Sequence, residues 1–271
     1  MRVVPLSDHP GELLRRERQR GTKEQRLARS QFDTARRQHQ AGLRRLEAKR
    51  DKARAKRRWL AWLMAALAIR RARRQAPAPP SLLTAMSDDE AKLAAGVKGE
   101  QAVADALGRS LNDDWVLLRG YRNRRGEIDH VLLGPGGLAA IEVKYVNGTV
   151  HCDGDRWRVV KFDNYGNKVE EYDLADRGSR SPSMQLNEPA DELRDFLRSR
   201  GEDVDLLRVV QLTHDKSRIG TCRRATVSIF TKTDQITALM KKVPQPLDAQ
   251  RRKRIESLIV GDHRHHDRRR R

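Results

Sequence analysis

Cysteine is scarce in this sequence, and no recognisable signal peptide opens it. The 271 residues contain only Cys152 and Cys222, with no CxxC pair. A scaffold held by several disulfides is therefore not expected, and a reducing, cytoplasmic location is the default expectation.

Long apolar runs are also missing. The longest, Trp59 to Ile69, has eleven residues between clusters of arginine. As a helix it would reach about 16 Å, roughly half of a bilayer core, so a membrane span is the least favoured interpretation. A buried helix, a self-association surface and a segment lying at the membrane surface, anchored by its tryptophans, remain open.

The sequence shows no Ser/His/Asp arrangement, no glycine-rich phosphate loop and no internal repeat. The histidines of the C-terminal HRHHDRRRR stretch are ascribed to a solvated cationic tail rather than to a metal site. Candidate catalytic residues therefore lie outside these patterns.

Positive charge is abundant but concentrated at the two ends. Of the net charge of +20, residues 1–80 carry +16 and residues 248–271 carry +5, which leaves −1 for the middle. Basic arms attract phosphate backbones and also anionic lipid. We expect five segments, listed here in order: a charged helical arm (1–58), a short apolar helix (59–75), a Pro/Ala linker (76–86), a compact domain (87–247) and a basic tail (248–271).

The middle segment alternates helical and strand-like patterns. Ser87 to Glu90 reads as a capping box that opens a helix, and Ser181-Pro182-Ser183 as the start of another helix, which carries Gln185. Several strands lie between and after them, while 163–180 reads as a polar loop. The order predicts an α/β domain with a mixed sheet.

A charged hairpin stands out at GEIDHVLLGPGGLAAIEVKY, residues 126–145. With Pro135-Gly136 at the turn, Asp129 faces Glu142, and Lys144 shares their side of the sheet. Facing carboxylates repel each other unless a cation lies between them. Either Mg²⁺ or Mn²⁺ bound to two oxygen ligands, or a structural cluster of the acids with Lys144, would account for this pattern.

Glu100 lies within the apolar stripe of the helix that begins near Ser87. An acid at such a position needs a partner, and we expect that partner to be the charged hairpin. A salt bridge with Lys98 is the alternative.

Four motifs in this order resemble the nuclease-related domain, NERD, over roughly residues 90–240. The motifs are GVKGE at 96–100, GEIDH at 126–130, IEVK at 141–144 and SPSMQ at 181–185. This family is grouped with the PD-(D/E)XK nucleases, although Ile128 stands where the superfamily name has proline. The resemblance implies a restriction-endonuclease-like fold and phosphodiester cleavage that depends on Mg²⁺ or Mn²⁺.

The resemblance also implies roles for individual residues. Asp129 and Glu142 correspond to the metal-binding acids, Lys144 to the catalytic lysine and Glu100 to the acid of the first helix, while Gln185 matches a polar position on a later helix. The expected substrate is nucleic acid, with DNA favoured. A non-catalytic nucleic-acid-binding protein and a membrane-peripheral protein are the alternatives.

For nucleic-acid contacts we single out arginines of the two basic ends: Arg57, Arg58, Arg70, Arg71, Arg251 and Arg252. The segment 59–69 is expected to support loose membrane contact or self-association.

Overall fold

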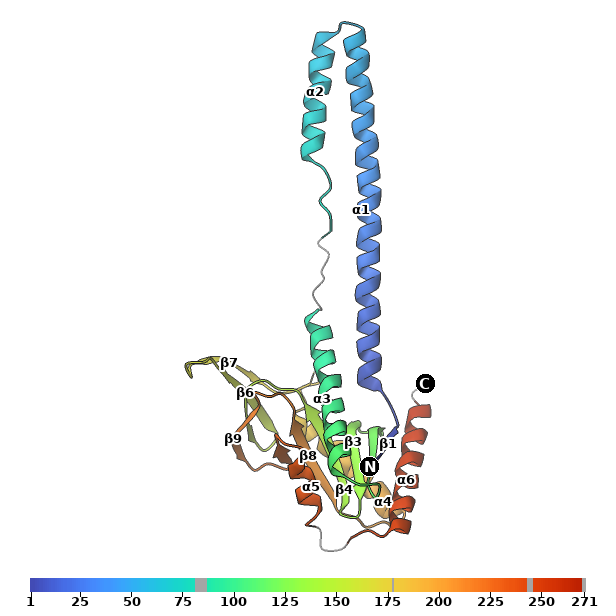
Figure 1. The fold of residues 1–271 in the computed structure, drawn as a ribbon, viewed down its shortest axis with the longest axis vertical. Helices are drawn as coiled ribbons and strands as arrows, with labels where there is room; N and C mark the ends of the chain where they lie inside the picture. Colours follow the sequence, from blue (N-terminus) through green and yellow to red (C-terminus); the bar gives the residue numbers. More distant parts are fainter. Residues whose placement is uncertain (81–86, 177, 243–245, 270–271) are drawn as a thin grey trace. The chain divides into compact units, whose positions relative to one another are not determined.

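The computed structural model describes residues 1–80, 87–176, 178–242 and 246–269 (Figure 1). The chain divides into two compact units. The larger unit comprises Met1–Leu13 with Lys92–Arg271, and the smaller unit comprises Leu14–Ala91. We describe each unit by itself.

The larger unit is built on a mixed six-stranded sheet. Its strands, in spatial order, are β1 (Arg2–Pro5), β2 (Val116–Arg122), β3 (Glu127–Gly134), β4 (Gly137–Lys144), β8 (Leu206–Leu212) and β10 (Ser228–Phe230). β3 runs antiparallel to both of its neighbours, β2 and β4, while β1, β8 and β10 each join a neighbour in parallel.

Helices cover both faces of this sheet because its central strands are apolar on both sides. Val131 and Leu133 pack in the core with α4 (Pro182–Ser199) and α6 (Ala249–Arg268). Leu132 packs with α3 (Asp88–Ser110) and α5 (Asp234–Met240) on the opposite face. The protein is thus an α/β protein with a mixed sheet flanked by helices, as the sequence predicted.

The hairpin between β3 and β4 has the predicted register. Leu133 pairs with Leu138 and Val131 with Ala140, so Pro135-Gly136 forms the two-residue turn. Gly137 follows with φ +101°, a conformation that a residue with a side chain rarely adopts. The register places Asp129 and Glu142 just beyond the last pair, His130 with Ile141.

A second, four-stranded sheet belongs to the same unit. Its strands, in spatial order, are β7 (Lys168–Asp173), β6 (Arg156–Phe162), β5 (Thr149–Asp153) and β9 (Arg218–Arg223). Strand β7 corrects the expectation of a loop over 163–180. Its sequence KVEEYD is too charged to read as a strand, but it pairs with β6 at an exposed sheet edge.

Two expectations about the ends of the domain were wrong. The predicted tail, 248–271, is a helix over its described part: α6 opens at its N-cap Asp248 and buries Ile255 and Ile259 in the core. At the other end, β1 pairs in parallel with β2, although we assigned it to the arm. The compact unit therefore extends beyond 87–247, because apolar residues at both ends complete its core.

The smaller unit holds the long basic helix that the sequence predicted. Helix α1 runs from His9 to Ala55, its first residues belonging to the larger unit, and α2 spans Trp59–Arg74. His39 Nε2 lies 2.8 Å from the carbonyl of Ala72, which joins the two helices side by side. The predicted linker, 76–86, lies partly outside the described residues. No helix among the described residues is long and apolar enough to cross a membrane.

Candidate active site

The charged residues of the hairpin meet at one end of the six-stranded sheet. Asp129 on β3 and Glu142 and Lys144 on β4 lie on the face of the sheet that packs against α4, because strand side chains alternate between the faces. The Lys144 ammonium donates a hydrogen bond of 2.6 Å to Glu142 Oε1. The predicted placement of Glu142 and Lys144 on one face is therefore observed.

Gln185 comes to this cluster from α4. The helix begins where the Ser181 hydroxyl accepts a hydrogen bond from the Met184 N–H, which puts Gln185 in the first turn. Lys144 Nζ donates to Gln185 Oε1 over 2.8 Å, and Gln185 Nε2 donates to the carbonyl of Arg180 over 2.7 Å. These two bonds fix the amide and so hold the lysine.

Asp129 has one partner in the backbone of the facing strand. Its Oδ2 accepts a hydrogen bond of 2.7 Å from the Val143 N–H. Burial raises the pKa of Asp129 well above its ordinary value, and the Glu142 and Glu100 carboxylates raise it further. The hydrogen bond and Lys144 offset only part of this cost.

Glu100 reaches the same cluster from α3. Burial raises its pKa to about 7; Arg119 opposes that shift, and Glu127 and Glu142 add to it. Glu100 was expected to have the charged hairpin as its partner; the hairpin groups that act on its pKa are the like charges Glu127 and Glu142, and the opposing cation, Arg119, is on β2. His130 points away from Asp129, with its Nε2 3.1 Å from the carbonyl of Glu100.

Lys144 remains protonated in this setting. Burial lowers its pKa, but the Glu142 and Asp129 carboxylates outweigh burial and raise the pKa above the ordinary value. One ammonium thus serves the two carboxyl groups of Asp129 and Glu142, and Glu100 adds a third acid close to both of them. This group of side chains is short of positive charge, which a bound cation would supply.

The side chains present fit a hard divalent cation. Carboxylate oxygens of Asp129 and Glu142 are the ligands that Mg²⁺ and Mn²⁺ prefer, and Mg²⁺ usually keeps several waters. Across the described ranges, no group of three or more His, Cys, Asp or Glu side chains is arranged to enclose a metal. A cation here would therefore rely on two protein carboxylates and on oxygens from water or substrate.

The cluster opens into a basic cavity of about 750 Å³. Asp129, Glu142 and Gln185 are among the residues that line it. Its arginines are Arg122, Arg124, Arg125, Arg180 and Arg269. The sequence analysis missed all five, because they come from the end of β2 and the loop after it, the segment before α4 and the C-terminal end of α6. Five arginines around three acids, Glu127, Asp129 and Glu142, leave a surplus of positive charge that suits a polyanionic ligand.

The arginines selected from the sequence lie elsewhere. Arg251 bonds Glu202 over 2.9 Å and Arg252 bonds Asp114 over 3.0 Å, so both are engaged within the larger unit. The other four, Arg57, Arg58, Arg70 and Arg71, are exposed on the smaller unit. The cavity lining contains none of the six.

His263 is likewise part of the fold rather than of a cationic tail. Its Nδ1 accepts a hydrogen bond from the Arg122 N–H, and its Nε2 lies 3.2 Å from the carbonyl of Leu6. Burial lowers the pKa of His263, so the ring is neutral and ties α6 to β2.

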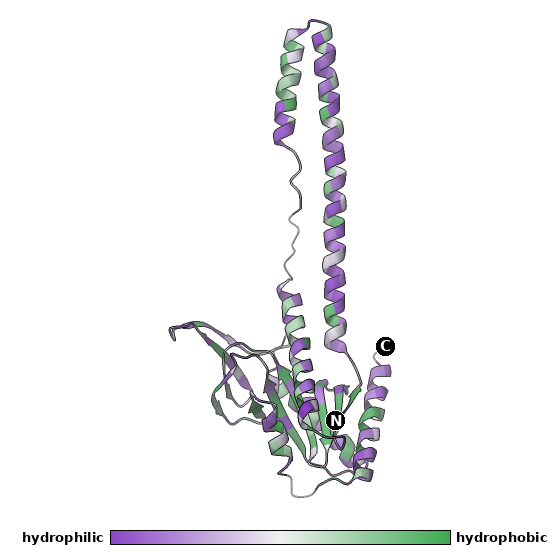
Figure 2. Ribbon diagram, viewed as in Figure 1, coloured by the Kyte–Doolittle hydropathy of each residue, from purple (hydrophilic) through white to green (hydrophobic). Residues whose placement is uncertain are grey.

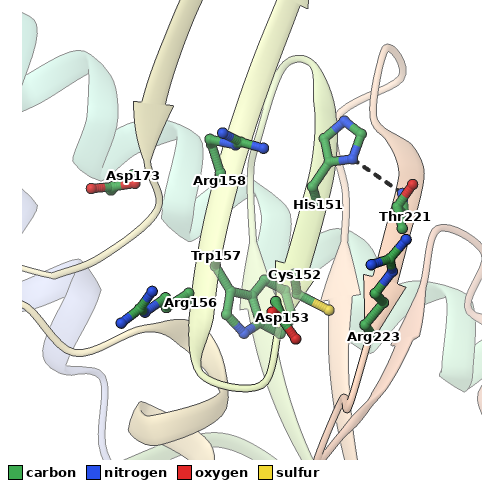
Figure 3. A pocket seen from close by; sticks show the side chains of 9 residues that line it. All are labelled: His151, Cys152, Asp153, Arg156, Trp157, Arg158, Asp173, Thr221 and Arg223. Carbon is green, nitrogen blue, oxygen red and sulfur yellow. Dashed lines mark hydrogen bonds between the residues drawn. The ribbon is translucent and has the colours of Figure 1, made fainter.

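A second basic hollow, of about 440 Å³, lies on the four-stranded sheet (Figure 3). His151, Arg156, Arg158 and Arg223 line it, and His151 Nδ1 accepts a hydrogen bond from the Thr221 N–H over 3.1 Å. Of its acids, Asp153 is bonded to Arg224 outside the hollow. The hollow lacks the lysine-linked acid pair found in the first cavity, and the sequence reading assigned it no role.

Comparison with known proteins links this geometry to one family. Residues 95–213 match the family model described as "Nuclease-related domain", NERD. The matched segment includes Glu100, Asp129, Glu142, Lys144 and Gln185. No curated protein and no solved structure matches the chain.

Proposed function

Since residues 95–213 form a nuclease-related domain, of the PD-(D/E)XK-like nuclease superfamily with its restriction-endonuclease-like fold, we propose that this protein hydrolyses phosphodiester bonds in nucleic acid with a divalent cation. Nuclease domains of this superfamily typically use divalent metals. The observation that carries the proposal is the position of the acid–lysine–glutamine cluster: Asp129, Glu142 and Gln185 line an arginine-rich cavity, and Lys144 is hydrogen-bonded to Glu142 and Gln185.

In this proposal Asp129 and Glu142 hold Mg²⁺ or Mn²⁺. When bound, such an ion polarises a phosphoryl oxygen and lowers the pKa of a bound water. Lys144, kept protonated by its neighbours, stabilises the negative charge that develops on the phosphate. Gln185 holds the ammonium in place through its hydrogen bond to Nζ. Glu100, with a pKa near 7, can accept or release a proton at the edge of the site.

The substrate is inferred from the charge of the cavity. Arginines bind phosphate oxygens through paired N–H groups, and in this proposal those of the cavity hold a nucleic-acid backbone. Arg125 is exposed and Arg122 pairs with Glu127, so the lining combines free and anchored cations. We propose DNA as the substrate.

A cleavage assay on the full chain tests the proposal. Purified protein is incubated with supercoiled plasmid, linear duplex, single-stranded DNA and RNA, in Mg²⁺, in Mn²⁺ and in EDTA. We expect nicking of DNA only with metal, together with a rise in melting temperature on adding metal. Absence of cleavage on every substrate, with no thermal shift, would reject the hydrolase and favour a nucleic-acid-binding module on a nuclease fold.

A stability measurement examines the acid cluster without any substrate. Asp129→Asn should raise the free energy of unfolding in EDTA by about 1 kcal/mol, because it removes repulsion with Glu142 and keeps an oxygen for the Val143 N–H. The folded-state pKa of Asp129 is raised above its unfolded value, so ionisation costs stability as the pH rises through that pKa. The gain should therefore be larger at pH 8 than at pH 5.

In saturating Mg²⁺ the wild type should become more stable than Asp129→Asn. The ion binds the wild type more tightly and so adds more to its free energy of unfolding. Urea unfolding at both pH values, with EDTA and with Mg²⁺, provides the measurement. A destabilised Asp129→Asn in EDTA at pH 8 would contradict the account of the cluster.

A further inference from the structure

The α1–α2 hairpin of the smaller unit carries an apolar surface that nothing in the described structure of that unit covers. Six large apolar residues of α2 are each 40% to 69% exposed. We call them the α2 apolar face: Trp59, Leu60, Trp62, Leu63, Met64 and Leu67. Figure 2 shows the first part of α2 as hydrophobic, beside an α1 that is mostly hydrophilic. Six large apolar side chains exposed together on one short helix indicate a binding surface.

The opposite side of α2 already has a partner. Ile69 is buried and Ala65, Ala66 and Ala68 are partly buried, and Arg73 bonds Glu47 of α1 over 3.2 Å. A helix that is apolar all round needs burial on every side. Since α1 covers only one side of α2, burying the α2 apolar face requires a second apolar partner.

Positive charge surrounds this face at both ends. Arg57 and Arg58 precede α2, and four arginines occupy its last turns. Across residues 44–74 there are 13 Lys and Arg and only 2 Asp and Glu, a net charge of +11. The partner must therefore be apolar in its interior and anionic at its surface.

A cavity of about 400 Å³ lies on the hairpin itself, where α2 meets α1, and none of the residues of the α2 apolar face line it. Arg50, Arg70, Arg73 and Arg74 line it, together with Ala66 and Ile69. A pocket that places arginines next to apolar side chains matches a phosphate group attached to an acyl chain.

We propose that the α1–α2 hairpin binds the surface of an anionic phospholipid bilayer, with the α2 apolar face inserted at the level of the headgroups and the arginines on lipid phosphates. The sixteen residues of α2 rise by about 24 Å, and their apolar part by about 16 Å, which is too short to span the roughly 30 Å core. Tryptophans at the membrane interface, with arginine flanks, are typical of helices that lie in the plane of the surface.

Two other partners for the α2 apolar face explain fewer of its features. A second copy of the hairpin would bring two segments of net charge +11 together. A nucleic acid would satisfy the arginines but would leave Leu60, Leu63 and Leu67 exposed to water. Neither accounts for the apolar face and its charged ends together.

Vesicle flotation of the full chain tests the proposal. We expect the protein to float with vesicles of phosphatidylcholine containing about 30% phosphatidylglycerol and only weakly with phosphatidylcholine alone, because each arginine near an anionic surface adds about fivefold in partitioning. Brominated lipids should quench the tryptophan emission. Only Trp59 and Trp62 are accessible to them, since Trp115 and Trp157 are buried in the larger unit.

Two variants separate the apolar and the charged contributions. Leu60→Gln/Leu63→Gln/Leu67→Gln should lower partitioning more than tenfold at constant net charge. Arg70→Gln/Arg71→Gln should lower it by roughly twentyfold, mainly at low salt. Circular dichroism should show the helix content of both variants to be that of the wild type.

A matched control uses apolar residues of similar exposure on the second sheet. Phe162→Gln/Val169→Gln/Ile219→Gln should change partitioning by less than twofold. Equal losses in this control and in the leucine variant would overturn the proposal, as would absence of binding to anionic vesicles.

Two further results also overturn it, each in favour of another occupant. In the absence of vesicle binding, a dimer in sedimentation equilibrium that the leucine variant dissociates would point to self-association. If the protein does not bind vesicles but binds duplex DNA, and only the arginine variant weakens that binding, the partner would be nucleic acid.

Discussion

Glu142→Gln is expected to abolish metal-dependent cleavage, a loss of at least about a thousandfold, while nucleic-acid binding is retained. The substitution keeps the shape of the side chain but removes one of the two carboxylates proposed to hold the ion. It also removes the charge to which Lys144 bonds over 2.6 Å. Plasmid nicking measures the chemistry, and filter binding in EDTA measures affinity separately.

Asp129→Asn should behave in the same way, and Lys144→Met should lower the cleavage rate by about a hundredfold or more with less effect on the metal-induced thermal shift. The difference follows from the roles: the two acids hold the ion, whereas the lysine acts on the substrate. Asp195→Asn is the matched control, since Asp195 is exposed on α4 and pairs with Arg194 at 3.1 Å, away from the acid cluster and its cavity. Metal-dependent cleavage by Glu142→Gln at the wild-type rate would rule out the assigned site.

The two proposals concern different units and fail independently. Cleavage depends on the acid cluster of the larger unit, whereas vesicle binding depends on the α2 apolar face. If both hold, the protein is a nuclease held at a membrane surface, and the Leu60/Leu63/Leu67 variant should keep full cleavage in solution.

The sequence revealed the hairpin because local rules determine it. Pro135-Gly136 can occupy only a few turn types, and alternation along β3 and β4 then fixes which side chains share a face. The resemblance supplied Gln185. Its hydrogen bond to Lys144 depends on how α4 packs on the sheet, a long-range contact that no local pattern reports.

The elements that the sequence reading missed are those whose partners lie far along the chain. Strand β1 has four residues, which pair with Val116–Arg119 more than a hundred positions later. The cavity arginines come from three separate segments for the same reason. In α6 the basic composition concealed a readable signal: an Asp248 cap, then Ile255, Ile259 and His263 at intervals of four, which form one helix face.

Substitutions on that face of α6 should have the second large effect, a loss of stability of the larger unit. Ile259→Ala should destabilise the larger unit by about 3 kcal/mol, because the side chain is fully buried and its removal leaves a cavity in the core. Lys253→Ala on the same helix is the control, and should stay within about 0.5 kcal/mol since Lys253 is exposed. Urea unfolding followed by the emission of the buried Trp115 and Trp157 measures both.

Deleting residues 248–271 should have a still larger effect and prevent the larger unit from folding, because Ile255, Ile259 and the bonds of His263 to Leu6 and Arg122 are lost together. Its cavity would also lose Arg269, so cleavage should disappear along with the fold. A truncated chain that unfolds at the same urea concentration as the full chain would show that α6 is a dispensable basic extension. In that case the buried isoleucines would need another explanation.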